Sequence, residues 1–150
     1  MKLAEALLLR ADLKKKLASL RERIGRNAML QEGEAPQEKV EDLLAQATSA
    51  LQEQQKLVRS INATNASAKL ADGRLLADLL AQRDMLIEQH SLLTSTIAAT
   101  HKEVDRYSQR EIKWVPQINV ASLQKQVDDL SRKIREVNVA VQAANWQIDI

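Results

Sequence analysis

Mostly hydrophobic residues recur at alternating steps of three and four along residues 76–111, a spacing that places them on one side of an α-helix. Neither proline nor glycine interrupts the stretch. At 1.5 Å per residue, it predicts a rod of about 55 Å, the longest helix of the chain. The positions of its seam are Leu76, Leu79, Arg83, Leu86, His90, Leu93, Ile97, Thr100, Val104, Tyr107 and Glu111.

The same spacing predicts three more helices, so that the four cover about 3–29, 36–64, 73–112 and 120–146. The seam of the first helix is Ala6, Arg10, Leu13, Leu17, Leu20 and Ile24. That of the second is Val40, Leu44, Ala47, Leu51, Gln54, Val58, Ile61 and Asn65. The fourth has a wholly apolar seam: Val120, Leu123, Val127, Leu130, Ile134, Val137, Val141, Ala144 and Ile148.

Turn residues mark the connections between these helices. Gly33 can adopt a left-handed conformation, and Pro36 suits the first position of the second helix. Asp72-Gly73 predicts a turn before the third helix, and Asn119 is suited to cap the fourth. Short connections between long helices favour antiparallel neighbours.

The fold class that follows is all-α. We expect residues 1–150 to form a single helical domain, an antiparallel up-down-up-down four-helix bundle with coiled-coil-like packing. Hydrophobic residues make up 45% of the chain, which has only three glycines and two prolines, too few turn residues for a sandwich or barrel. The longer third helix should project beyond the others. Apolar residues at its projecting end need a packing partner, and a second subunit can provide one. We therefore expect a homodimer, with contacts from Val104, Tyr107, Glu111 and Trp114.

Antiparallel topology would gather polar residues from all four helices at one end of the bundle. Arg10 and Arg83 both lie on seams there, and a buried cation needs a partner. Glu5, Asp78 or Asp84 could provide partners in an internal salt-bridge network. Alternatively, the two guanidinium groups could bind a carboxylate or phosphate. The whole polar cluster consists of Glu5, Arg10, Asn62, Asn65, Asp78, Arg83, Asp84, Asn145 and Trp146.

No catalytic motif is present, and we expect no enzymatic activity, no cofactor and no metal site. The chain has no cysteine, and its histidines, His90 and His101, stand about 16 Å apart along one helix, too far to share a metal ion. His90 is expected to be a hydrogen-bonded seam residue. No apolar run approaches the ~18 residues of a membrane span, so the default location is cytoplasmic and no membrane partner is expected.

Charge is distributed unevenly along the chain. Residues 1–30 carry eight basic and three acidic side chains, a net charge of +5, whereas residues 31–60 carry three and six, a net charge of −3. Adjacent helices of opposite charge attract each other, so the basic first helix needs no polyanion. Weak nucleic-acid binding through this helix is nevertheless an alternative, with contacts from Lys14, Lys15, Lys16, Arg21, Arg23 and Arg26.

Several short motifs resemble a family of small uncharacterised bacterial all-helical proteins, some of which carry the label septicolysin. The motifs are residues 3–7, 10–13, 61–65, 83–84, 107–108, 111–114 and 144–146. The resemblance covers nearly the whole chain and implies a bacterial helical protein of unknown function, without an established active site. Most of the matched motifs belong to the polar cluster.

The sequence therefore predicts a non-enzymatic cytoplasmic helical bundle that self-associates and serves as an interaction or scaffold protein of unknown pathway. Two alternatives remain open. One is a module that binds a small anion, carboxylate or phosphate, at the polar cluster. The other is a weak nucleic-acid binder.

Overall fold

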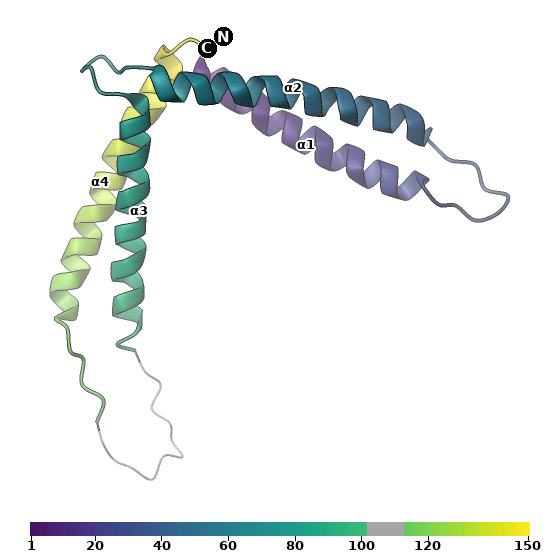
Figure 1. The fold of residues 1–150 in the computed structure, drawn as a ribbon. Coiled ribbons are helices and arrows are strands. Elements are labelled where there is room, and N and C mark those ends of the chain that lie inside the picture. Colours follow the sequence, from purple (N-terminus) through teal and green to yellow (C-terminus); the bar gives the residue numbers. More distant parts are fainter. Residues whose placement is uncertain (102–112) are drawn as a thin grey trace. The chain divides into compact units, whose positions relative to one another are not determined.

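The computed structural model describes residues 1–101 and 113–150, and this part of the chain contains four α-helices and no strand longer than an isolated bridge. The helices are α1 (Leu3–Asn27), α2 (Val40–Ser67), α3 (Leu76–Ala98) and α4 (Val120–Gln147). The predicted all-α class with four helices is confirmed (Figure 1).

Contacts divide the chain into two compact units. Unit 1 comprises Met1–Leu76 and Gln142–Ile150, and unit 2 comprises Ala77–Val141. Unit 1 therefore contains α1, α2 and the end of α4, while unit 2 contains α3 and the rest of α4. The expectation of a single domain stays a prediction.

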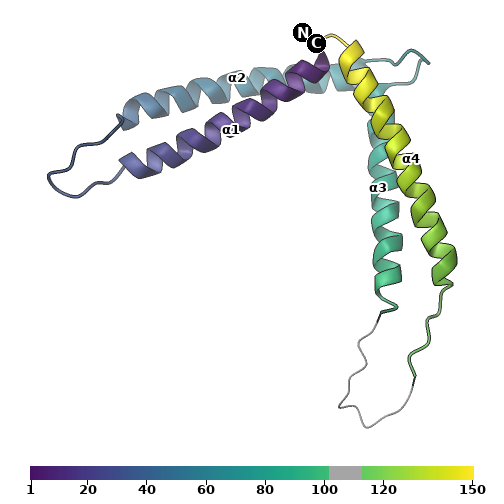
Figure 2. The same cartoon turned by 180° about the vertical axis from the view of Figure 1, so that it is seen from behind.

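In unit 1, α1 and α2 lie side by side as an antiparallel hairpin (Figures 1 and 2). The predicted seam of α1 is confirmed, because Ala6, Leu13 and Leu20 are buried. These apolar side chains recur with the period at which a helix returns to the same face, and their burial between the two helices provides much of the stability of the pair.

The predicted seam of α2 is partly wrong. Leu44 and Leu51 are 50% and 53% exposed, and the residues that face α1 lie one position earlier, at Leu43, Ala50 and Leu57. Both series repeat every seven residues and both are apolar. Periodicity could not distinguish them, because either one makes a continuous stripe, and only contact with α1 decides which is buried.

The start of α2 also differs from the prediction. The helix begins at Val40 rather than at Pro36, which lies in the connecting loop. The backbone N–H of Glu38 donates to Oδ1 of Asn27 at 3.2 Å, and Lys39 is extended, with φ −73° and ψ 125°. Glu38, which contacts α1, and the extended Lys39 therefore both lie outside the helix. The left-handed conformation predicted for Gly33 is confirmed, with φ +92°.

The two ends of the chain meet in unit 1. The backbone N–H of Leu3 donates to the carbonyl of Ile148 at 2.9 Å, and that of Ile150 donates to the carbonyl of Met1 at 3.0 Å. Lys2 Nζ donates to Asp149 Oδ2 at 2.8 Å. The start of α1 and the end of α4 are therefore neighbours, in agreement with antiparallel order.

The predicted turn at Asp72-Gly73 is confirmed. Gly73 has φ +85°, a conformation that residues with a side chain rarely adopt. The backbone N–H of Arg74 donates to Asp72 Oδ1 at 3.1 Å, and Leu70 N–H donates to the carbonyl of Arg74 at 2.8 Å. The turn leads to Leu76, which is fully buried at the start of α3.

In unit 2, α3 and α4 lie side by side (Figures 1 and 2). Their seams agree with the prediction: Leu79 and Leu86 of α3, and Val127 and Leu130 of α4, are buried. His90 Nε2 forms a hydrogen bond with Ser131 Oγ at 3.1 Å across the two helices. This contact confirms the structural role predicted for His90.

The third helix is shorter than predicted. It ends at Ala98 rather than near residue 112, and with 23 residues it is the shortest of the four helices that the structure describes. Thr94 and Thr96 donate side-chain hydrogen bonds to the carbonyls of His90 and Leu92, which compete with the helix ladder. Threonine also has a lower helix propensity than the leucines upstream. The predicted contact residues Val104, Tyr107 and Glu111 lie outside the described residues.

The fourth helix starts where the sequence predicts. Asn119 Oδ1 accepts a hydrogen bond from the backbone N–H of Ser122 at 3.0 Å, which confirms Asn119 as the N-cap of α4.

Candidate functional site

The polar cluster predicted from the sequence is divided between the two units. Unit 1 holds Glu5, Arg10, Asn62, Asn65, Asn145 and Trp146, and unit 2 holds Asp78, Arg83 and Asp84. A site built from both arginines therefore stays a prediction.

Glu5 has a structural role at the start of α1. Its carboxylate accepts a hydrogen bond of 2.7 Å from the backbone N–H of Lys2, the residue that precedes the helix. Arg10, one and a half turns later, is half-buried. The structure shows no ion pair between Arg10 and any residue in the described ranges, Glu5 included.

The asparagines of unit 1 differ in exposure. Asn145 is buried, with 7% of its surface exposed, while Asn65 is half-buried and Asn62 is exposed. Trp146, next to Asn145, is exposed over more than half of its surface. No buried side-chain polar atom within the described parts of the chain lacks a hydrogen-bond partner.

Arg83 of unit 2 already has an anionic partner. Its Nε and NH2 groups donate to Asp84 Oδ1 at 3.1 and 2.9 Å. Asp84 is therefore the one predicted salt-bridge partner that pairs with Arg83, and it is the next residue in the sequence. Asp78 lies exposed in the first turn of α3, where the helix dipole favours an acidic side chain.

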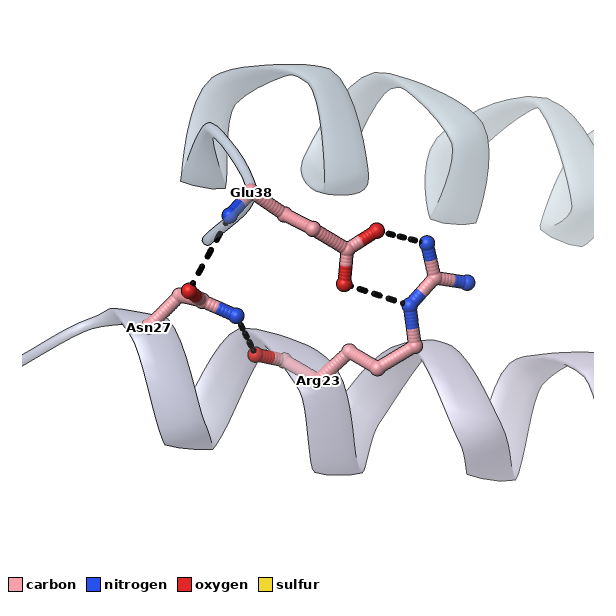
Figure 3. Close-up of polar contacts among 3 residues, drawn as sticks. All are labelled: Arg23, Asn27 and Glu38. Atoms are coloured by element: carbon pink, nitrogen blue, oxygen red, sulfur yellow. Dashed lines mark hydrogen bonds and ion pairs between the residues drawn. The ribbon is translucent and has the colours of Figure 1, made fainter. Parts of the chain in front are cut away.

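The sequence did not predict a polar contact at the loop end of the α1/α2 hairpin, between Arg23, Asn27 and Glu38 (Figure 3). Arg23 Nε donates to Glu38 Oε2 at 2.8 Å, and its NH2 group donates to Oε1 of the same carboxylate. Asn27 Nδ2 donates to the carbonyl of Arg23 at 2.9 Å. The Arg23 guanidinium holds the pKa of the Glu38 carboxyl below its ordinary value.

This contact lines an open cleft of about 610 Å³ whose wall also includes Arg26 and Leu30. Arg26 donates to Glu22 Oε1 at 2.9 Å, so both arginines of the cleft are paired with carboxylates. A cleft whose charges neutralise one another offers little attraction to a charged ligand. We therefore interpret the Arg23–Glu38 contact as a clasp that joins the two helices.

The second feature that the sequence did not predict is the exposure of an apolar stripe on the outside of unit 1, which the heptad pattern assigns to the buried seam of α2. The stripe consists of Leu44, Leu51 and Val58 of α2, and we call it the outer stripe. The residues are seven apart and therefore share one face, one position beyond the buried Leu43, Ala50 and Leu57. Leu44 and Leu51 are half exposed, and Val58 is half-buried.

Trp114, the one predicted oligomer contact within the described residues, is 74% exposed. Together with Thr96, Pro116 and Ile118 it lines a small apolar cleft of about 250 Å³ in unit 2. A large aromatic side chain at the surface is typical of a contact residue. Its role in oligomer formation stays a prediction.

In residues 1–101 and 113–150, no three histidine, aspartate or glutamate side chains are grouped to hold a metal ion. Nor does any described helix combine the length and the apolar composition that crossing a membrane requires.

The comparison with known families covers nearly the whole chain. Residues 10–150 match the model of a family of unknown function, DUF6847. The chain belongs to this family. The crystal structure of a functionally unknown conserved protein from Corynebacterium diphtheriae is similar to this DUF6847 chain, with 32% sequence identity and a TM-score of 0.88. The alignment covers 98% of this chain and 96% of that one.

No curated protein matches this DUF6847 chain. The predicted resemblance to uncharacterised bacterial helical proteins is confirmed by the family and by the C. diphtheriae structure. Neither finding carries the label septicolysin.

Proposed function

We propose that this DUF6847 protein is a non-enzymatic interaction protein of the cytoplasm, a scaffold that binds helices of other proteins and also associates with itself. The observation that carries the proposal is the outer stripe. Leu44 and Leu51 remain half exposed although α2 already has a buried seam against α1. A helix that packs on one side only is expected to be polar elsewhere, so a second apolar stripe favours a second packing partner.

Three arginines of the described residues also favour this function over catalysis. The arginines that line the larger cleft and the arginine of α3 are each paired with a nearby carboxylate. Catalytic groups, by contrast, are usually left available to a substrate and have strongly perturbed pKa values. His90, the half-buried histidine, contacts a serine of the neighbouring helix.

Self-association is proposed to involve the surface around Trp114, as the sequence predicted. Light scattering at micromolar concentration is expected to give a mass that is a multiple of 16.8 kDa. Because Trp114 is largely exposed, Trp114→Ala should weaken the oligomer while the helix content stays unchanged.

Trp146→Ala is the matched control, since it removes another exposed tryptophan from a different unit. This variant should retain the mass of the parent protein. A strictly monomeric parent would contradict self-association, and equal effects of the two substitutions would contradict the role of Trp114.

A further inference from the structure

We infer that one edge of the α1/α2 hairpin binds an amphipathic helix of a partner protein, and that this helix carries acidic residues beside its apolar stripe. The inference rests on the proposed function and names the partner by its chemistry. The edge consists of the outer stripe of α2 together with Lys14 and Arg21 of α1.

The position of these residues follows from the seam. Leu13 and Leu20 of α1 and Leu43 and Ala50 of α2 are buried. In an antiparallel helix pair, the residues that follow such buried positions on the two helices flank the same edge of the interface. Lys14 and Arg21 therefore lie on the edge that also carries Leu44 and Leu51.

Charge distinguishes the two sides of this edge. Lys14 and Arg21 are exposed, and the structure shows no ion pair or hydrogen bond between their side chains and any residue in its described ranges. Arg23 and Arg26, also on α1, differ in that both have glutamate partners. Beyond the outer stripe, α2 presents Glu41, Thr48 and Gln55, and the one charged residue among them is acidic. The edge is thus an apolar stripe with one basic wall.

A helix with apolar residues at heptad spacing matches the outer stripe, and acidic residues on the flank that faces α1 match its basic wall. A second copy of the chain matches less well. If two such edges face each other, the cations of one copy meet either the cations or the leucines of the other. The first arrangement is repulsive, and the second buries cations without partners.

The test uses two synthetic helical peptides of about three heptads, with the same leucines at the seam positions. One carries glutamate at the flanking positions and the other carries lysine, so that neither associates with itself. Their dissociation constants for the full-length protein are measured by fluorescence anisotropy at several salt concentrations. The glutamate peptide should bind at least about tenfold more tightly, and the difference should shrink as salt increases.

Two double variants test the two parts of the edge. Leu44→Ser with Leu51→Ser should weaken binding of the glutamate peptide at least about tenfold. Leu8→Ser with Leu92→Ser removes two other exposed leucines outside the edge and should have little effect. All four side chains are exposed, so folding should be retained, which circular dichroism checks.

Lys14→Glu with Arg21→Glu should reverse the preference, so that the lysine peptide binds more tightly. Lys56→Glu with Arg59→Glu makes the same change of charge at exposed positions of α2 away from the edge and should leave the preference unchanged. A reversal only in the first variant would locate the electrostatic contact at the basic wall.

Equal affinity for the two peptides, or no binding of either, would overturn the inference. So would an oligomer that the Leu44→Ser and Leu51→Ser substitutions dissociate, because this result would assign the edge to a second copy. The first two leave the proposed self-association intact, because light scattering with Trp114→Ala measures it separately. Conversely, a monomeric protein that still prefers the glutamate peptide would support the edge and contradict self-association.

Discussion

Arg23 and Glu38 join the two helices of unit 1 at the end where the chain turns back. A guanidinium and a carboxylate that make two parallel hydrogen bonds have a defined mutual orientation, unlike a single surface ion pair. Asn27 adds to this orientation by accepting the backbone N–H of Glu38. At the scale of single residues, the clasp therefore defines where the loop ends and α2 begins.

The clasp predicts a pH dependence of stability. Hydrogen bonds from Arg23 lower the pKa of Glu38 below its ordinary value of 4.5. The unfolded chain then binds a proton more readily than the folded chain, so the contribution of Glu38 is present above pH 4.5 and is lost as the pH falls through the lowered pKa. Glu38→Gln should lower the melting temperature at neutral pH and reduce its decrease in acid.

Melting temperatures of the parent and the variant between about pH 7 and pH 3 check this prediction. Asp72, Asp129 and Asp149 also have lowered pKa values next to basic partners, so the parent and the variant should both lose stability in acid, and the difference between their curves reports Glu38. Glu32→Gln, in the same loop, is the control and should follow the parent. Identical curves for Glu38→Gln and the parent would contradict the role of the clasp.

At the scale of elements, α2 has two apolar faces of similar hydrophobicity. Leu43 is buried against α1, and Leu44, its neighbour in the sequence, is half exposed. The two side chains point about 100° apart around the helix, so both cannot face α1. The face that α1 leaves uncovered becomes the outer stripe, on which the proposed partner helix would pack.

Two substitutions compare how much the buried face and the exposed face of α2 contribute to the free energy of unfolding. Leu43→Ala leaves a cavity in the seam and should lower the free energy of unfolding by about 2–5 kcal/mol. Leu44→Ala removes a side chain of the same size from the surface and should change it by only about 0.5 kcal/mol. Urea denaturation of both variants provides the values. Equal losses would mean that α1 covers both faces.

At the scale of the whole molecule, the chain closes on itself where its two ends meet in unit 1. Leu3 bonds to Ile148, Met1 bonds to Ile150, and Lys2 pairs with Asp149. These contacts link the first and last residues of the sequence, which the helical pattern cannot relate to each other. They attach the end of α4 to unit 1 although most of this helix belongs to unit 2.

Deletion of residues 148–150 removes both backbone hydrogen bonds and the ion pair. At about 1 kcal/mol for each net hydrogen bond, the free energy of unfolding should fall by about 2 kcal/mol or more. Asp149→Asn, which retains both backbone bonds, should have a much smaller effect, because the ion pair is exposed to solvent. Thermal unfolding followed by circular dichroism distinguishes the two. An unchanged deletion variant would contradict a stabilising role for the chain ends.

The candidate site was only partly predictable. The sequence predicted that nine polar residues form one cluster, and six of the nine do share unit 1. It could not assign their partners. Arg83 pairs with its neighbour Asp84, and Glu5 caps the backbone at Lys2, so neither is positioned by the long-range network that the pattern suggested.

Spacing along the sequence by itself determined the four helices, the seams of α1 and α4, the described part of the α3 seam, the Asp72-Gly73 turn and the Asn119 cap. Each of these features depends on residues within about one or two helical turns of each other. The early end of the third helix was also encoded locally, by its threonines. The prediction missed it because the heptad pattern continues beyond them. Only the tertiary structure decided which face of α2 is buried, that Glu38 binds Arg23, and that the chain ends meet. Each of these is a choice between alternatives with similar local free energies, and contact with a distant segment selects one of them.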